Sequence, residues 1–171
     1  MTDDPMKAFQ EYATPGPEHA VLGRRLGTWQ LTVKFFPAPG APPFTSSGVS
    51  RYAWILGDRV LENHVSGDPD GRPFEGRGYS GFDTRLRRYW FVWFDTMATG
   101  ATRGDGAAGP DGNTLLWSVE STDLVARGPR RTRAIERFVA PDEWMSLHYD
   151  VAPDGGEFVR SEFRYVRQRG G

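Results

Sequence analysis

The chain has 171 residues, of which 38% are hydrophobic and 13% aromatic, enough for one domain with a substantial core. A formal net charge of −1 excludes strong long-range attraction to nucleic acid or acidic lipid, and the lack of cysteine excludes disulfides and thiolate chemistry. The sequence has no apolar run near the roughly 20 residues of a membrane-spanning helix, and no signal-peptide pattern. We therefore expect a cytoplasmic domain without nucleic-acid or membrane partners.

The beginning of the chain predicts a loosely ordered segment followed by one short helix. Residues 1–16 are polar and interrupted by proline, so we expect them to be flexible. Residues 17–26 begin with proline, place apolar side chains at helical spacing and precede Gly27, which together predict a helix. The folded domain is expected to span residues 17–169.

From residue 28 onward the sequence has the pattern of short strands. Residues 28–36 alternate apolar and polar side chains, as in a strand with one buried face. The later segments are separated by turn residues of the kind that hairpins use, such as the Asp-Pro-Asp-Gly that ends at Gly71. The ten expected strands are residues 28–36, 45–56, 59–66, 74–82, 89–95, 99–103, 114–121, 131–139, 144–151 and 158–167.

This run of strands predicts the fold class. Regularly spaced short strands with turns between them are typical of all-β sandwiches and barrels. Sequential hairpins favour a single ten-stranded antiparallel up-and-down β-barrel, with the short helix before it, over a Greek-key sandwich. A barrel of this size can enclose a small ligand.

The strand over residues 89–95 is apolar on both faces. Phe91, Trp93 and Asp95 share one face; if that face is inward, Asp95 is a candidate acid or base, and otherwise it caps the following turn. The opposite face must also be covered, most simply by a second copy of the chain, which predicts a homodimer. That face consists of Trp90, Val92 and Phe94.

The three histidines are the other candidates for acid–base chemistry. Glu62 and His64 share one strand face and would form a carboxylate-oriented imidazole if inward, but the opposite face is at least as apolar, so a solvent-exposed pair is the alternative. His19 could reach the barrel mouth from its helix or make a structural hydrogen bond. His148 alternates with apolar residues and is expected outside. Their spacing predicts no metal site.

Gly27-Thr28-Trp29 opens the first strand directly after a short helix. This Gly-x-Trp resembles the calycin pattern of lipocalins and fatty-acid-binding proteins, in which the tryptophan closes the barrel floor and an arginine from the last strand lies across it. Arg167 has the matching parity, because the end of the last strand meets the beginning of the first in an antiparallel closure. The resemblance therefore implies contact between Arg167 and Trp29.

Six short motifs occur in order along nearly the whole chain: Pro17-Glu18-His19, Leu26-Gly27-Thr28-Trp29, Gly57-Asp58-Arg59, Phe74-Glu75-Gly76, Gly81-Phe82-Asp83 and Phe94-Asp95-Thr96-Met97. Together they resemble a bacterial family of lipocalin-like domains catalogued only as a domain of unknown function. That resemblance implies a barrel and supplies no catalytic residues. Nitrobindin-like barrels, which are similar in fold, hold haem iron through a histidine on the final strand. Residues 158–167 contain none, so we expect no haem and no other cofactor.

We expect the barrel to bind a small, mostly apolar molecule, because pockets of that kind combine apolar walls with few polar groups. The expected lining residues are Trp29, Glu62, Phe91, Trp93, Asp95, Trp117 and Tyr149. One alternative is a cofactor-independent isomerase, cyclase or hydrolase that uses Asp95 with His64 or His19. The other is a protein-interaction module that docks a partner on the face containing Trp90.

Overall fold

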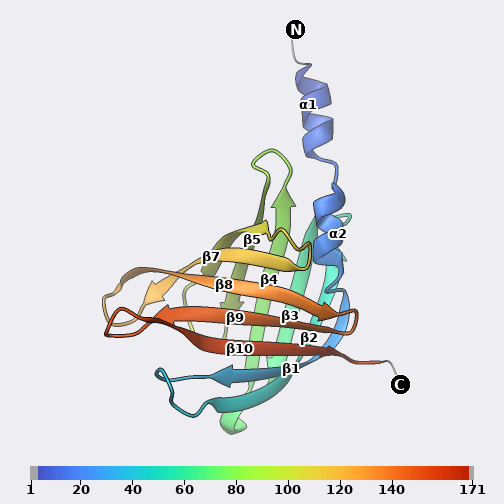
Figure 1. Cartoon of the computed structure of the whole chain (residues 1–171). Coiled ribbons are helices and arrows are strands. Elements are labelled where there is room, and N and C mark those ends of the chain that lie inside the picture. The colour runs from blue at the N-terminus through green and yellow to red at the C-terminus, as the bar shows by residue number, and fades with distance from the viewer. Residues whose placement is uncertain (1–3, 170–171) are drawn as a thin grey trace.

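A computed structural model describes residues 4–169 and shows a closed antiparallel barrel of ten strands (Figure 1). Each strand pairs with its neighbours in sequence, and the first pairs with the last, in the order β1-β10-β9-β8-β7-β6-β5-β4-β3-β2. The expected up-and-down barrel is confirmed. The strands are β1 (Gly27–Phe35), β2 (Phe44–Ile55), β3 (Val60–Gly67), β4 (Phe74–Asp83), β5 (Arg88–Asp95), β6 (Thr102–Ala108), β7 (Thr114–Asp123), β8 (Gly128–Ala140), β9 (Glu143–Val151) and β10 (Glu157–Arg167).

The barrel closes where β1 meets β10, and Trp29 is paired there with Arg167. The guanidinium carbon of Arg167 lies 4.1 Å from the centre of the Trp29 ring. Arg167 also donates hydrogen bonds to the Leu26 carbonyl at 2.6 Å and to the Asp142 carboxylate at 3.1 Å. Trp29 is 1% exposed and donates its indole N–H to the Arg25 carbonyl at 2.6 Å. The predicted contact between these two side chains is confirmed.

Helix α2 (Pro17–Gly23) covers one end of the barrel (Figure 1). It buries Leu22 completely and His19 almost completely. The helix is shorter than the expected 17–26, because the chain leaves helical pairing at Gly23 and turns toward β1. This early end places Arg25 beyond the helix, where its side chain is 4% exposed inside the barrel.

A second helix, α1 (Pro5–Tyr12), lies within the segment 1–16, for which we predicted no regular structure. Its N-cap is Asp4, whose side chain accepts a hydrogen bond from the Met6 N–H at 2.9 Å. The missed signal was an Asp-Pro pair, a capping residue followed by proline at the first helical position. The helix projects from the end of the barrel, and none of its residues is buried (Figure 1).

The sixth strand differs most from the prediction, since we expected residues 99–103 and β6 spans Thr102–Ala108. The glycines at 104 and 106 suggested a loop, because glycine weakens an isolated strand. In the barrel both positions face aromatic rings of neighbouring strands, Phe91 beside Gly104 and Trp117 beside Gly106. Close packing of rings against the backbone therefore explains why this glycine-rich segment is a strand.

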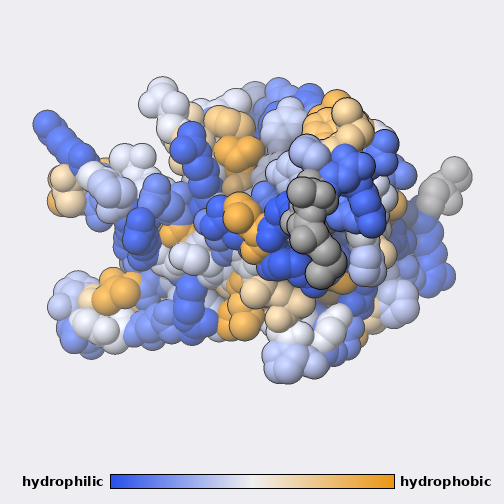
Figure 2. Space-filling model, turned by 90° about the horizontal axis from the view of Figure 1, so that it is seen from above, coloured by the Kyte–Doolittle hydropathy of each residue, from blue (hydrophilic) through white to orange (hydrophobic). Residues whose placement is uncertain are grey.

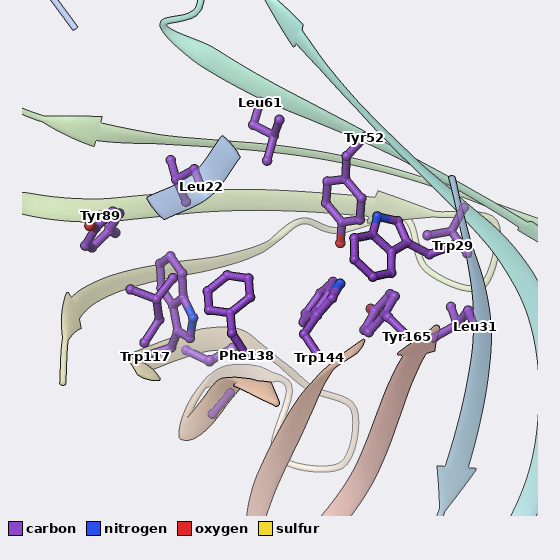
Figure 3. Close-up of a cluster of buried hydrophobic side chains, with 14 of the residues drawn as sticks. Leu22, Trp29, Leu31, Tyr52, Leu61, Tyr89, Trp117, Phe138, Trp144 and Tyr165 are labelled. Carbon is purple, nitrogen blue, oxygen red and sulfur yellow. The ribbon is translucent and has the colours of Figure 1, made fainter. Parts of the chain in front are cut away.

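Aromatic side chains fill the end of the barrel beneath α2, as the close-up shows (Figure 3). Trp144 and Tyr165 are stacked with ring centres 3.6 Å apart and planes 3° apart. Trp29 and Tyr52 meet Trp144 edge to face, at 6.3 Å and 5.9 Å between ring centres. These rings form the floor of the barrel, a term used below for this packed end.

Seen from the end that carries α1, the surface is mostly hydrophilic with scattered hydrophobic residues (Figure 2). None of the helices in the described part of the chain has the length and apolar character needed to cross a membrane. Between β3 and β4 the short 3₁₀ helix η1 (Pro69–Gly71) belongs to the opposite, open end of the barrel, together with the loops after β1 and β5.

Candidate ligand-binding cavity

A cavity of about 620 Å³ occupies the interior of the barrel above the floor. It begins at Tyr52 and Trp144 and extends to a rim that includes Phe44, Asp70 and Met97. Phe44 and Met97 are 68% and 80% exposed, so the cavity opens to solvent at this rim. A volume of this size is within the usual range for small-molecule sites.

Inward-facing glycines create much of this space. A Cβ atom on Gly76 would lie 2.2 Å from the Trp93 ring, and one on Gly104 would lie 2.2 Å from the Phe91 ring. A Cβ atom on Gly78 would also be too close to the Trp93 ring, at 2.9 Å. The two rings therefore lie against the backbone of the neighbouring strand, which leaves the centre of the barrel open.

Four of the predicted lining residues lie in the cavity wall: Phe91, Trp93, Asp95 and Trp117. Trp29 does not line the cavity. It is buried in the floor between Arg167 and the Trp144 ring, so its role is to close the barrel. Further apolar side chains of the wall come from β1, β3, β4 and β10, among them Leu31, Val33, Val65, Phe74 and Phe163.

Asp95 lies in the cavity wall and also caps the turn after β5, so both of the placements considered from the sequence are present. Its carboxylate accepts hydrogen bonds from the Trp93 indole N–H at 2.7 Å and from the Met97 backbone N–H at 2.8 Å. The first bond fixes the orientation of a ring in the cavity wall, and the second caps the turn after β5. Asp95 is thus a half-buried carboxylate at the cavity rim.

Glu62 and His64 do not reach the cavity, which corrects both assignments. They lie on the outer face of β3, where His64 Nε2 is 3.1 Å from the Glu75 carboxylate and Glu62 is 3.7 Å from Arg77. The inward face of β3 is the one that carries Leu61, Asn63 and Val65. Burial of two apolar residues on that face decides the orientation of the strand.

His19 is also outside the cavity. It is 7% exposed beneath α2, and its Nδ1 accepts a hydrogen bond from the Gly16 backbone N–H at 3.1 Å. Burial lowers the pKa of His19, which favours the neutral ring that this acceptor role requires. The structural hydrogen bond was one of the two sequence-based alternatives, and it places His19 away from Asp95.

For β9 the prediction placed the wrong face of the strand toward the interior of the barrel. We expected Tyr149 inside and His148 outside, but Tyr149 lies on the outer face beneath the Arg133 guanidinium, 3.5 Å from the ring centre. The inward residues are Trp144, Ser146 and His148, paired in register with Tyr165, Phe163 and Ser161 of β10. The outer face of β9 is the more apolar one, and this misled the parity assignment.

His148 is therefore a cavity residue that sequence reasoning missed. Its Nε2 lies 3.1 Å from the Ser146 hydroxyl, and its ring centre is 4.9 Å from that of Phe163. Burial lowers the pKa of His148 to about 4, so the ring is neutral at neutral pH. It offers a neutral hydrogen-bonding group within a largely aromatic wall.

A polar cluster lies where the cavity meets the floor. Arg25 forms an ion pair with Glu136, and both side chains line the cavity. Beside them Asn63 donates to the Tyr52 hydroxyl at 3.0 Å and accepts from the Ser50 hydroxyl at 2.9 Å. Burial raises the pKa of Tyr52 to about 12, so its hydroxyl stays protonated. The polar groups at this depth are held by one another.

The outer face of β5 is less open than the sequence suggested. Trp90 and Val92 are half-buried, and a Cβ on Gly81 would lie 2.5 Å from the Trp90 ring. Phe94 is the exposed member of the face, at 47%. The homodimer through this face stays a prediction. Among residues 4–169, no group of three or more histidine or acidic side chains is placed to hold a metal ion.

Comparison with known proteins agrees with this geometry at the level of the fold. The structure is similar to a crystal structure of Rv2717c from M. tuberculosis, with a TM-score of 0.64, 17% identity, and coverage of 91% of this chain and 100% of that one. A redesigned β-barrel matches at a TM-score of 0.44 and 15% identity, over 87% of this chain and 96% of that one. No curated protein matches the sequence significantly. The model of one protein family, described as "Protein of unknown function (DUF1579)", matches residues 14–167, and the chain therefore belongs to that family.

Proposed function

We propose that this protein binds a small, mostly apolar molecule inside its barrel. The observation that carries the proposal is the cavity of about 620 Å³, whose wall has aromatic rings laid against glycines. A filled core would place large side chains across this space, as happens at the floor. Burial of an apolar molecule against such a wall contributes about 25 cal/mol for each Å² removed from water.

The wall supplies few polar groups, which suits a ligand with one polar end. Asp95 stands at the rim, His148 halfway along β9, and the Arg25–Glu136 pair near the floor. Such sparse polar groups orient a ligand in an otherwise apolar pocket. A kinship with calycins, which the Gly-x-Trp opening suggests, is consistent with this function and forms part of the proposal.

The acid–base alternative loses the pairing on which it depended. His64 lies on the outer wall and His19 lies beneath α2, so neither joins Asp95 in the cavity. No contact in the described residues connects Asp95 to His148. Binding is therefore the function that the arrangement of side chains supports best.

Tryptophan fluorescence provides the experiment, because Trp93 and Trp117 both line the cavity. Titration with N-phenylnaphthylamine, a neutral aromatic probe, should quench tryptophan emission saturably. Ser161→Phe, which places a ring in the lumen, should abolish the quenching, whereas Ser118→Phe on the exposed face of β7 should not. Equal quenching in both variants would show that the probe binds elsewhere and would overturn the proposal.

Asp95→Asn then tests the polar anchor at nearly constant volume. We expect its affinity for a hydrogen-bonding ligand to change by about 1–3 kcal/mol, the scale of one buried polar contact. The matched control is Asp105→Asn, on the neighbouring strand, where the carboxylate faces outward and lies 3.4 Å from Arg88. If the two variants behave alike, Asp95 is a turn residue only, and cavity binding stands without it.

A further inference from the structure

Positive and negative side chains are unequally represented around the cavity. Within residues 4–169, Arg25 is the one cationic side chain in the wall, whereas Glu136, Asp95 and Asp70 each contribute a carboxylate. Asp95 accepts hydrogen bonds from neutral donors, and neither it nor Asp70 has an ion-pair partner in the described part of the chain. The wall thus has a surplus of negative charge.

The single cation is already neutralised. Arg25 is 4% exposed and forms its ion pair with Glu136, which is itself largely buried. The guanidinium carbon lies 5.3 Å from the centre of the Trp144 ring, so aromatic packing fixes it as well. Separation of such a buried pair leaves an unpaired charge in a poorly solvated place, which is strongly unfavourable. The positive charge of Arg25 is therefore already balanced by Glu136, and its unpartnered Nε can offer a ligand one N–H donor but no net charge.

Three buried hydrogen-bond donors of the wall have no acceptor in the described residues: two neutral indoles and Arg25 Nε, which belongs to the guanidinium already paired with Glu136. Trp117 Nε1 and Trp144 Nε1 are buried without an acceptor in the described residues, and His148 adds an uncharged ring. These groups can interact with a hydroxyl or carbonyl oxygen but cannot balance a full negative charge. An ammonium group, by contrast, would meet Asp95 and the face of an aromatic ring such as Trp93 at the rim.

We propose that the polar group of the ligand is uncharged or cationic, and that the cavity rejects carboxylates and phosphates. This inference rests on the proposed function and specifies the ligand class for the same site. An anion would lose its hydration, gain no free cation and lie near Asp95 and Glu136. An alcohol, an amide or an amine attached to an apolar body meets none of these costs.

Three ligands of equal length test the proposal: decanol, decylamine and decanoate, each used to displace N-phenylnaphthylamine at neutral pH. Decanoate should bind about tenfold or more weakly than decanol, because a buried charge without a counter-ion is costly. Decylamine should bind at least as tightly as decanol. Decanoate binding as tightly as decanol overturns this inference and leaves the proposed function intact. A probe that does not bind at all overturns the proposed function first.

Two variants show whether the charges of the wall cause the discrimination. Glu136→Gln releases Arg25 from its partner, so the affinity for decanoate relative to decanol should rise about tenfold. Glu62→Gln makes the same change on the outer wall and should leave the ratio unaltered. If Glu136→Gln does not fold, Asp95→Asn serves instead, with a smaller rise for decanoate and a loss for decylamine. An unchanged ratio in the variant that folds overturns the inference.

Discussion

The two ends of this barrel use aromatic side chains in opposite ways. At the floor, Trp144 stacks on Tyr165 and Trp29 meets it edge to face, so the rings fill the lumen by packing on one another. Toward the rim, Trp93 and Phe91 pack on glycines of neighbouring strands, so their rings do not cross the lumen. The same residue types thus make either a core or a cavity, and the residue opposite each ring decides which.

The two ends of the barrel should therefore have different roles, one in stability and the other in binding. The floor is where the first and last strands close and where α2 covers the barrel, so we expect its rings to contribute most to stability. The wall near the rim keeps accessible apolar surface that a ligand can cover. Substitutions in the two halves should therefore separate into effects on unfolding and effects on binding.

The largest effect is expected from Trp29→Ala. Loss of this buried ring from beneath Arg167 should lower the free energy of unfolding by about 3–5 kcal/mol, the usual range for large core aromatics. Trp93→Ala, the same change in the half-buried cavity wall, should cost only about 1–2 kcal/mol. Urea unfolding followed by circular dichroism measures both values. Equal losses would remove the distinction between floor and wall.

Acid should lower the free energy of unfolding, because His148 is buried in the cavity wall. Its pKa is about 4 in the folded protein, below the ordinary 6.5, so the unfolded chain binds the proton more readily. The stabilising contribution is complete above pH 6.5 and is lost as the pH falls toward 4, by up to about 3 kcal/mol at 1.36 kcal/mol per unit. His148→Gln should flatten this part of the pH profile of the free energy of unfolding, measured by urea unfolding at each pH.

The pairing of a ring with a glycine can be tested at Gly76. An alanine Cβ there would lie 2.2 Å from Trp93, so the ring must move into the cavity. We expect Gly76→Ala to cost about 1–3 kcal/mol, as overpacking usually does, and to weaken probe binding. Gly128→Ala, whose new Cβ has its nearest neighbour at 4.0 Å, is the control. Adding Trp93→Ala to Gly76→Ala should recover part of the loss, and additive losses would contradict the close packing.

The strands that sequence predicted well are those with one clearly apolar inward face. In β1 and β10 the alternation of apolar side chains identified the buried face, and the parity of Arg167 against Trp29 followed from it. In β5 both faces are apolar, and the carboxylate at its end did not decide between them. The fold depends on burial of large apolar side chains, so the alternation of apolar and polar residues along a strand can be recognised in the sequence.

The candidate site was harder to predict because a cavity does not require apolar residues at every inward position. On β9 the inward Ser146 and His148 satisfy each other, while the more apolar outer face packs under long arginine side chains such as Arg133. The ion pair of Arg25 and Glu136 joins residues from distant parts of the chain, which no local spacing reveals. Contacts between polar residues inside the barrel are thus the feature of the candidate site that could not be predicted from the sequence.

The smallest effect on folding is expected on the outside of β5, where the comparison of the two ends does not apply. The Trp90 ring packs against Gly81, whereas Phe94 is 47% exposed. Because Phe94 is largely in contact with solvent, Phe94→Ser should change the free energy of unfolding by no more than about 0.5 kcal/mol. If a second copy of the chain covers this face, the same substitution should weaken self-association measured by sedimentation, because it removes the exposed apolar ring. Leu124→Ser, at an 87% exposed position between β7 and β8, is the control and should leave association unchanged. A wild-type protein that sediments as a monomer at every concentration would contradict the homodimer and leave the outer face of β5 as an ordinary solvent-facing wall.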